Sequence, residues 1–157
     1  MKIRQAGVAL IEVLVALLIM CIGLLGAAAI QLNALKYTDS SAISSQASFI
    51  AYDMMDRIRA NSSNVSQYVL ASLPATAPAG NLASAVTQDR SDFIANALAI
   101  GATAASIGVT GFVVTINISW NDTRAAAAVT MNGSSNNTAN TRTFTLVSRV
   151  AADAVTQ

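Results

Sequence analysis

The chain has 157 residues, of which 54% are hydrophobic and 11% charged, whereas about 25% charged is ordinary for a globular domain. Nine basic against eight acidic side chains leave a net charge of +1, so the composition excludes an intrinsically disordered chain and a strongly basic nucleic-acid binder. There is no histidine and a single cysteine, Cys21, so the sequence lacks the commonest general base and metal ligand and predicts no catalytic residue, metal site, cofactor or intrachain disulfide.

Residues 8–30 form an almost wholly apolar run with one charge, Glu12. Two cations, Lys2 and Arg4, precede it. As a helix with a rise of ~1.5 Å per residue, the run is about 34 Å long, enough to cross a hydrocarbon core of ~30 Å. The cations predict a cytoplasmic N-terminus. A cleaved secretory signal peptide is disfavoured, because its apolar region usually has only ~7–15 residues. The residues alone therefore indicate an N-terminal membrane anchor.

Glu12 is the informative residue of this run. A carboxylate in an apolar helix costs several kcal/mol unless it is paired or protonated. No basic residue lies near it on its own helix, since the next one is Lys36. Its partner is therefore expected to be another chain, a terminus or a proton. A cut after Gly7 would create an amine on Val8, one helical turn from Glu12, and that amine could meet the carboxylate of a staggered neighbouring helix.

Residues 31–61 continue the helix with a different pattern. A stripe of apolar residues at spacings of 4, 3, 4 and 4 predicts one buried face. Its members are Ile43, Ala47, Ile50, Met54 and Ile58. Asp53 and Arg57 stand four residues apart and are expected to pair. No proline interrupts residues 8–61, so one continuous helix is expected.

Gly23 and Gly26 are the weak points of the expected long helix. Each glycine destabilises a helix by up to ~1 kcal/mol relative to alanine. They mark positions where the helix can bend or unwind locally, or where another helix can approach closely.

Residues 62–157 are expected to form a small globular head. The segment 62–80 is rich in turn-forming residues and predicts a connection. Ser91 or Asp89 is expected to cap a short helix that runs to about Ile100. The residues expected to turn inward from this helix are Phe93, Ile94, Ala97 and Leu98.

Two segments of alternating apolar and polar residues predict strands near residues 112–120 and 142–150. They are expected to pair antiparallel across residues 121–141, a connection that either holds a short extra strand near 127–131 or is mobile. Residues 101–111 are small and are expected to be flexible. The head is then an antiparallel sheet laid on the amphipathic half of the long helix, which is an α+β arrangement.

The acidic residues offer little chemistry. Asp53 with Asp56 and Asp89 with Asp92 are pairs three residues apart, which can share a helix face and act as acid and base. We interpret them instead as solvated surface charges. Asp122 could join a calcium site, but residues 132–137 supply no carboxylates that would complete it.

Residues 7–13, Gly-Val-Ala-Leu-Ile-Glu-Val, resemble the cleavage and methylation motif of type IV prepilins and type II secretion pseudopilins. The resemblance implies that an inner-membrane prepilin peptidase cuts between Gly7 and Val8 and methylates the new amine of Val8. Residues 1–7 would then be a leader, and Glu12 would serve in subunit docking. Val8 stands where phenylalanine is usual in the family.

Residues 51–61, Ala-Tyr-Asp-Met-Met-Asp-Arg-Ile-Arg-Ala-Asn, are similar to minor pilins of the PilV type, the type IV pilus modification proteins. The segments 14–18, 22–26 and 46–47 share this similarity. It implies a pilin-like α+β fold, in which one long N-terminal helix has a transmembrane first half and an amphipathic second half that packs on a small antiparallel sheet.

The same resemblance implies a structural subunit, not an enzyme, that helps prime or cap type IV pilus assembly. Its partners would be prepilin peptidase, other minor pilins, the major pilin and a tip adhesin. It would lie in the bacterial inner membrane with its head in the periplasm, and then in the pilus fibre or at its tip. The alternatives are a minor pseudopilin of a type II secretion system and a signal-anchored periplasmic binding domain that is not cleaved. The sequence leaves open whether the pilus serves motility, adhesion or DNA uptake.

Overall fold

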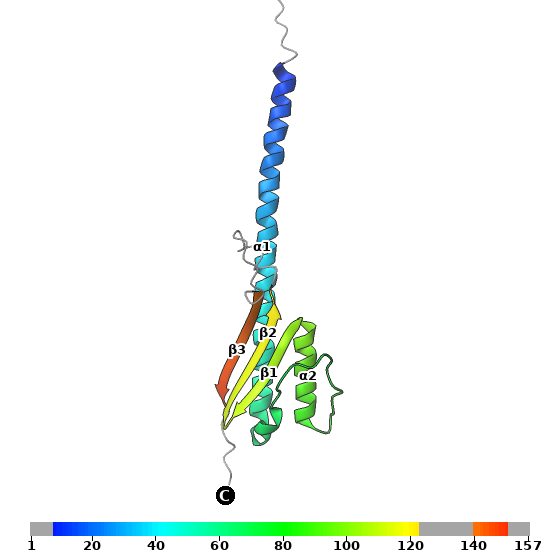
Figure 1. Ribbon diagram of the computed structural model, residues 1–157, viewed down its shortest axis with the longest axis vertical. Coiled ribbons are helices and arrows are strands. Elements are labelled where there is room, and N and C mark those ends of the chain that lie inside the picture. Colours follow the sequence, from blue (N-terminus) through cyan, green and yellow to red (C-terminus); the bar gives the residue numbers. More distant parts are fainter. Residues whose placement is uncertain (1–7, 123–139, 151–157) are drawn as a thin grey trace, which may run out of the picture. The chain divides into compact units, whose positions relative to one another are not determined.

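The computed structural model describes residues 8–122 and 140–150 (Figure 1). The chain divides into two compact units, an N-terminal unit, Met1–Thr38, and a C-terminal unit, Asp39–Gln157. The leader expected at residues 1–7 and the extra strand expected near residues 127–131 lie outside the described residues.

Helix α1 spans Val8–Ala60 without a break, which confirms the continuous helix predicted over residues 8–61. Proline is absent from the whole stretch, so no backbone donor is lost and no ring clashes with a preceding carbonyl. Arg57 and Arg59 lie in the last turn, where cations interact favourably with the negative end of the helix dipole.

The C-terminal unit contains a three-stranded antiparallel sheet in the order β1-β2-β3. β2 spans Val113–Asn121 and β3 spans Thr141–Arg149. They occupy the positions of the two strands expected from the alternating pattern, and they pair with an unbroken register from Val113 opposite Arg149 to Asn121 opposite Thr141.

The expectation of a flexible segment at residues 101–111 was wrong, because β1 spans Ala102–Thr110 and pairs along β2. Residues 105–110, Ala-Ser-Ile-Gly-Val-Thr, do alternate between apolar residues and polar or small ones, but the run is short and its flanks are small, so the local strand signal is weak. Gly111, with φ of +59°, sits in the tight connection to β2, and glycine adopts this backbone conformation without strain. Pairing with the strongly patterned β2 then determines the conformation of β1.

Helix α2, Ala85–Ala99, begins earlier than expected. Its N-cap is Ser84, whose side chain accepts a hydrogen bond from the backbone N–H of Thr87. Neither expected cap is available, because the Ser91 hydroxyl donates to the Pro78 carbonyl oxygen and Asp89 lies inside the helix. The expected end near residue 100 agrees with the structure.

The segment expected as a connection, residues 62–80, contains the 3-10 helix η1, Ser62–Tyr68. Directly after it, Leu70 forms an isolated antiparallel bridge with Ile107 of β1. This bridge covers part of the outer edge of β1.

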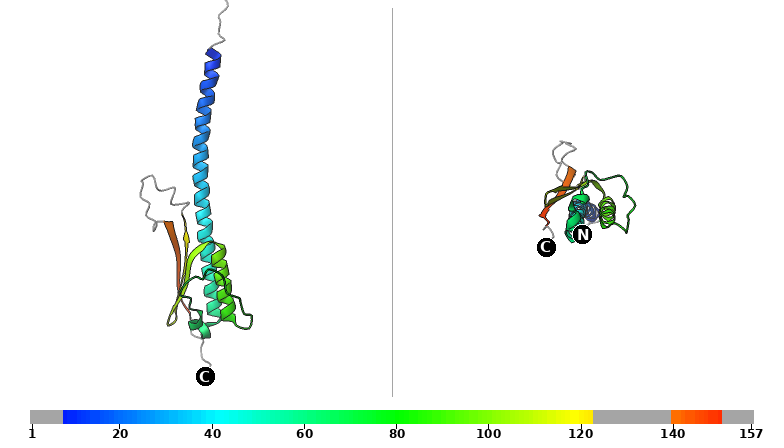
Figure 2. Two further views of the ribbon diagram at one scale, coloured as in Figure 1. Left: turned by 45° about the vertical axis from the view of Figure 1, so that its right-hand side comes forward. Right: turned by 90° about the horizontal axis from the view of Figure 1, so that it is seen from below.

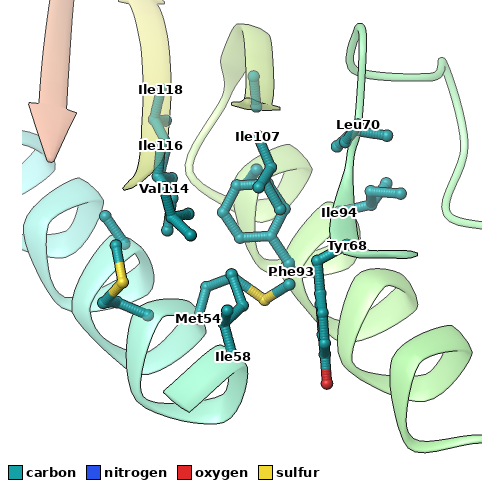
Figure 3. Packing of buried hydrophobic residues seen from close by; sticks show 14 of the residues in the cluster. Met54, Ile58, Tyr68, Leu70, Phe93, Ile94, Ile107, Val114, Ile116 and Ile118 are labelled. Atoms are coloured by element: carbon teal, nitrogen blue, oxygen red, sulfur yellow. The ribbon is translucent and has the colours of Figure 1, made fainter. Parts of the chain in front are cut away.

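One core joins α1, α2 and the sheet within the C-terminal unit. Figure 3 shows Phe93 of α2 between Met54 of α1 and Ile107 of β1. Each of these side chains is at most 3% exposed, and full burial of such a side chain contributes ~1.5–3 kcal/mol. The buried face of α1 is broader than the predicted stripe and comprises Ala47, Ala51, Met54, Met55 and Ile58.

Candidate assembly site

The first half of α1 carries its apolar side chains on all sides. Between Leu10 and Leu35, the large apolar side chains are 50–72% exposed. Among the described residues, α1 is the one helix long and apolar enough to cross a membrane. A helix that is apolar all round is stable only where lipid or other protein surrounds it. The N-terminal unit therefore presents a surface built for an apolar environment.

Glu12 interrupts this surface. Its side chain is exposed on α1, and no described residue forms an ion pair with it. Val8, the first described residue, lies four residues earlier on the same helix, which is a rise of about 6 Å. A lone carboxylate on an apolar helix calls for a cation from outside the helix. No residue within the described ranges supplies that cation to Glu12.

Gly23 and Gly26 lie inside α1, which remains helical through both. A Cβ built on either glycine would meet nothing within 4 Å. In the isolated chain these positions form a patch of bare helix backbone, where a neighbouring helix could approach closely.

A second, polar arrangement joins α1 to α2. Arg57 donates from Nε to Asp53 Oδ2 at 2.9 Å, and from Nη1 to Asp89 Oδ1 and Asp92 Oδ2, each at 3.0 Å. The pairing with Asp53 was expected. The interpretation of Asp89 and Asp92 as solvated charges was wrong, because both carboxylates bind Arg57.

Tyr68 extends this arrangement. Its hydroxyl donates to Asp89 Oδ2 at 2.8 Å and accepts from Asn61 Nδ2 at 3.0 Å. Burial raises the pKa of the Tyr68 phenol, and Asp89 raises it further, whereas the hydrogen bond from Asn61 opposes the increase. The hydrogen bond to Asp89 is the largest cause that raises the pKa of Arg57 far above its ordinary value. We call Arg57, Tyr68, Asp53, Asp89 and Asp92 the Arg57 cluster.

The Arg57 cluster joins the end of α1 to η1, which follows it directly, and to α2, which lies about 30 residues further along the chain. A permanently charged guanidinium held by three carboxylates is a poor proton donor, so the arrangement is suited to orient α2 on α1 and not to acid–base chemistry. The sequence signal for it was present, since Asp89 and Asp92 share a helix face, but nothing local indicated which cation they would meet.

Asp122 is buried and does not have the surroundings of a calcium ligand. Its Oδ2 accepts from Arg142 Nε at 2.7 Å and from the Ser40 hydroxyl at 2.5 Å. Within the described residues there is no group of three or more acidic, histidine or cysteine side chains that could hold a metal ion. The carboxylate instead joins α1 to β3 across the end of β2.

An open groove of about 420 Å³ lies between α1 and α2 in the C-terminal unit. Phe49 stands at its edge with 71% of its surface exposed. The lining is uncharged and consists of Gln46, Phe49, Ile50, Asn96, Ala99 and Ile100.

Comparison with known families agrees with these features. Residues 2–28 match the family model of the prokaryotic N-terminal methylation motif. Residues 29–93 match the model described as Tt1218-like, type IV pilin Tt1218. No curated protein and no solved structure matches the chain significantly. The methylation motif includes Glu12, and the Tt1218-like segment includes the amphipathic half of α1 and most of α2.

Both matches and the fold lead to one assignment. α1 is a long N-terminal helix with an apolar first half, and its second half packs on a small antiparallel sheet. The pilin family is a family of structural subunits and not of enzymes. The PilV type is not distinguished by the matches. The methylation motif followed by a Tt1218-like segment supports a type IV pilin.

Proposed function

We propose that the chain is a minor pilin that helps prime or cap the assembly of a type IV pilus. One observation carries this proposal, namely an apolar helix that is exposed on all sides and interrupted only by Glu12, one turn after Val8. A passive anchor gains nothing from a carboxylate in its apolar surface, because the charge opposes insertion. A subunit that must dock in one register gains a specific contact.

The proposed mechanism has two steps. Prepilin peptidase first cuts between Gly7 and Val8, and the methylated amine of Val8 becomes available to pair with Glu12 of a neighbouring subunit. The first half of α1 then leaves the bilayer, and its contacts with lipid are exchanged for contacts with other helices. Gly23 and Gly26 allow close approach or local unwinding during this exchange.

The location and partners follow from the same mechanism. The chain begins in the bacterial inner membrane with its N-terminus in the cytoplasm and its head in the periplasm. It then enters the pilus fibre or its tip beside other minor pilins, the major pilin and a tip adhesin. Loss of Lys2 and Arg4 would turn the net charge of +1 into −1. Because so small a net charge gives little electrostatic steering, selectivity for neighbouring subunits would depend on shape and apolar contacts.

The decisive experiment is the N-terminal mass of the protein from membranes and sheared filaments, with and without prepilin peptidase. We expect a mature chain that starts at methylated Val8 only when the peptidase is present, and we expect it in sheared filaments. A Gly7→Ala variant should remain uncut. A chain that still starts at Met1 in both strains would overturn the proposal and indicate an uncleaved anchor. A cleaved chain absent from pili but required for type II secretion would indicate a pseudopilin.

A further inference from the structure

The two edges of the sheet differ in how they are covered. The outer edge of β1 is bridged by Leu70, whose N–H and C=O both bond to Ile107 at 3.0 and 2.9 Å. The outer edge of β3 pairs with no described residue. In Figures 1 and 2, β3 lies at the margin of the sheet farthest from α2.

The register identifies the groups that this open edge presents. At one end the Val150 N–H donates to the Phe112 carbonyl, and at the other the Asp122 N–H donates to the Asn140 carbonyl. Hydrogen-bonded residues alternate along an antiparallel pair, so the even-numbered residues of β3 bond to β2. The odd-numbered residues direct their N–H and C=O groups outward. They are Thr141, Thr143, Thr145, Val147 and Arg149.

β3 lacks most of the devices that protect edge strands. Natural edges are blunted by short length, proline, a bulge or charged side chains, lysine above all; the charges of β3 are two arginines near its ends. β3 has nine residues, contains neither proline nor lysine, and pairs with β2 without a register shift. It is rich in β-branched and aromatic residues, which suit a strand. The edge is therefore a regular template for one more strand.

Beside this edge lies a partly exposed apolar surface. The ring of Tyr52 on α1 lies 6.4 Å from the ring of Phe144, measured between centroids, and Tyr52 is 52% exposed. Phe144 and Leu146 are only partly buried on the same side of the sheet. Side chains directly opposite on neighbouring strands lie ~4.5–5.5 Å apart. An added strand would therefore bury its own apolar side chains against these residues.

The charges at the end of β3 favour an acidic partner. β3 has two arginines and no acidic residue. Arg142 is paired with Asp122, whereas Arg149 forms no ion pair with any described residue. The nearby Arg59 bonds to the Ser148 hydroxyl as well as to Asp56. A carboxylate on an added strand beside Arg149 would be complementary to this end of the edge.

A second copy of the chain does not fit this edge when it pairs antiparallel. Tyr52 contacts Phe144 and, further along both elements, Arg59 contacts Ser148, so α1 and β3 run in the same direction. Antiparallel pairing of two β3 strands would therefore reverse one α1 relative to the other. Two copies anchored in one membrane cannot adopt that arrangement.

We propose that β3 is the docking edge for an extended segment of a different polypeptide, which adds antiparallel as a fourth strand. Its alternate side chains are apolar beside Phe144 and Leu146, and it carries a carboxylate near Arg149. Its backbone bonds to the outward groups of β3, as in other complexes formed by strand addition. This surface is separate from Glu12 and from the apolar half of α1, so its test does not depend on pilus assembly.

The test uses the full chain in detergent micelles and the capped heptapeptide Glu-Val-Thr-Val-Thr-Val-Thr, whose glutamate meets Arg149 in the antiparallel register. At saturating peptide we expect hydrogen exchange at the N–H groups of Thr143, Thr145 and Val147 to slow by about tenfold or more. Exchange at Phe144 and Leu146 should hardly change, because their N–H groups already bond to β2. A control peptide with N-methylated threonines at its third and fifth positions, which lie opposite Val147 and Thr145 so that their methyl groups face β3, should give no protection.

Two substitutions locate the effect. Thr145→Pro removes one outward N–H without removing a backbone hydrogen bond to β2, and we expect it to abolish protection by the peptide. Thr145→Val should preserve protection, and it controls for the side-chain hydrogen bond from Thr145 to Asn117 of β2, which both variants lose. Arg149→Glu should weaken binding of this peptide at least fivefold and favour one with lysine in place of glutamate. Unchanged exchange at the outward N–H groups, or equal protection by the N-methylated peptide, would overturn the proposal. Should Thr145→Pro fail to fold, the reversal of charge preference at Arg149 remains decisive.

Discussion

The two halves of α1 are parts of one helix with opposite relations to their surroundings. Between Leu10 and Leu35 the large apolar side chains are exposed on every side. After Asp39 the apolar side chains concentrate on a face covered by the sheet and α2. The contrast teaches that the angular distribution of apolar residues, and not their number, indicates what must cover a helix. The first half needs partners from outside the chain, whereas the second half is covered by the chain itself.

The largest expected effect tests the first half. Glu12→Ala should abolish incorporation into filaments while leaving the protein in the membrane, because it removes the carboxylate proposed to meet the neighbouring amine without adding a barrier to insertion. The matched control is Asp56→Ala, which removes an exposed acid from the other half of α1 and should leave incorporation nearly unchanged. Quantitative immunoblots of filament and membrane fractions measure how much of each variant is incorporated and how much stays in the membrane. Normal incorporation of the Glu12→Ala protein would contradict the docking role.

The second half should respond to truncation of its buried face. Met54→Ala should lower the free energy of unfolding of the head by ~2–5 kcal/mol, because it leaves a cavity in a closely packed core. Phe49→Ala, on the same helix but 71% exposed, should change it by less than ~1 kcal/mol. Denaturant unfolding of the full chain in micelles, followed by the near-ultraviolet signal of Trp120, measures the difference. Equal losses for the two variants would show that the buried face of α1 does not stabilise the head.

The Arg57 cluster should have a smaller effect. Arg57→Ala leaves Asp89, with its side chain 16% exposed, next to Asp92 without a cation. We expect a loss of about 1–2 kcal/mol, reduced by solvent screening because Arg57 itself is 34% exposed. Arg59→Ala, which breaks an exposed pair with Asp56, should cost less than ~1 kcal/mol. The same unfolding measurement at low and high salt compares the two variants. A larger loss of stability for Arg59→Ala than for Arg57→Ala would contradict the proposed role of the Arg57 cluster in holding α2 on α1.

The smallest effect concerns alkaline pH. The pKa of Tyr68 is raised in the folded state, so folding favours the protonated phenol. Its contribution to stability is complete below the ordinary pKa of about 10 and is lost as the pH rises through the folded-state pKa. As the pH rises from about 9 to about 11, we expect the denaturant concentration at the unfolding midpoint to fall less in Tyr68→Phe than in the unaltered chain. Tyr52→Phe, at an exposed position, should behave like the unaltered chain, and an identical pH dependence in Tyr68→Phe would refute the linkage.

Several features of the fold could be predicted because their signals are local. α1 follows from an uninterrupted helical pattern, and β2 and β3 follow from a largely regular alternation of apolar and polar residues. β1 is signalled only weakly, because its alternation of apolar and polar residues is confined to residues 105–110, and pairing with β2 completes the strand. The start of α2 was misplaced, because Ser91 and Asp89 have tertiary partners that a sequence pattern does not reveal.

The sequence by itself determined the long helix, its apolar first half and the position of Glu12 one turn after Val8, because these depend on neighbours within a few residues. Only the tertiary structure decided which cation meets Asp89 and Asp92, why Asp122 pairs with Arg142, and which edge of the sheet pairs with no other described residue. The ion pairs among these features join residues 20 to 35 positions apart. Their chemistry is visible in the residue types, but their partners are set only when the chain closes around its core.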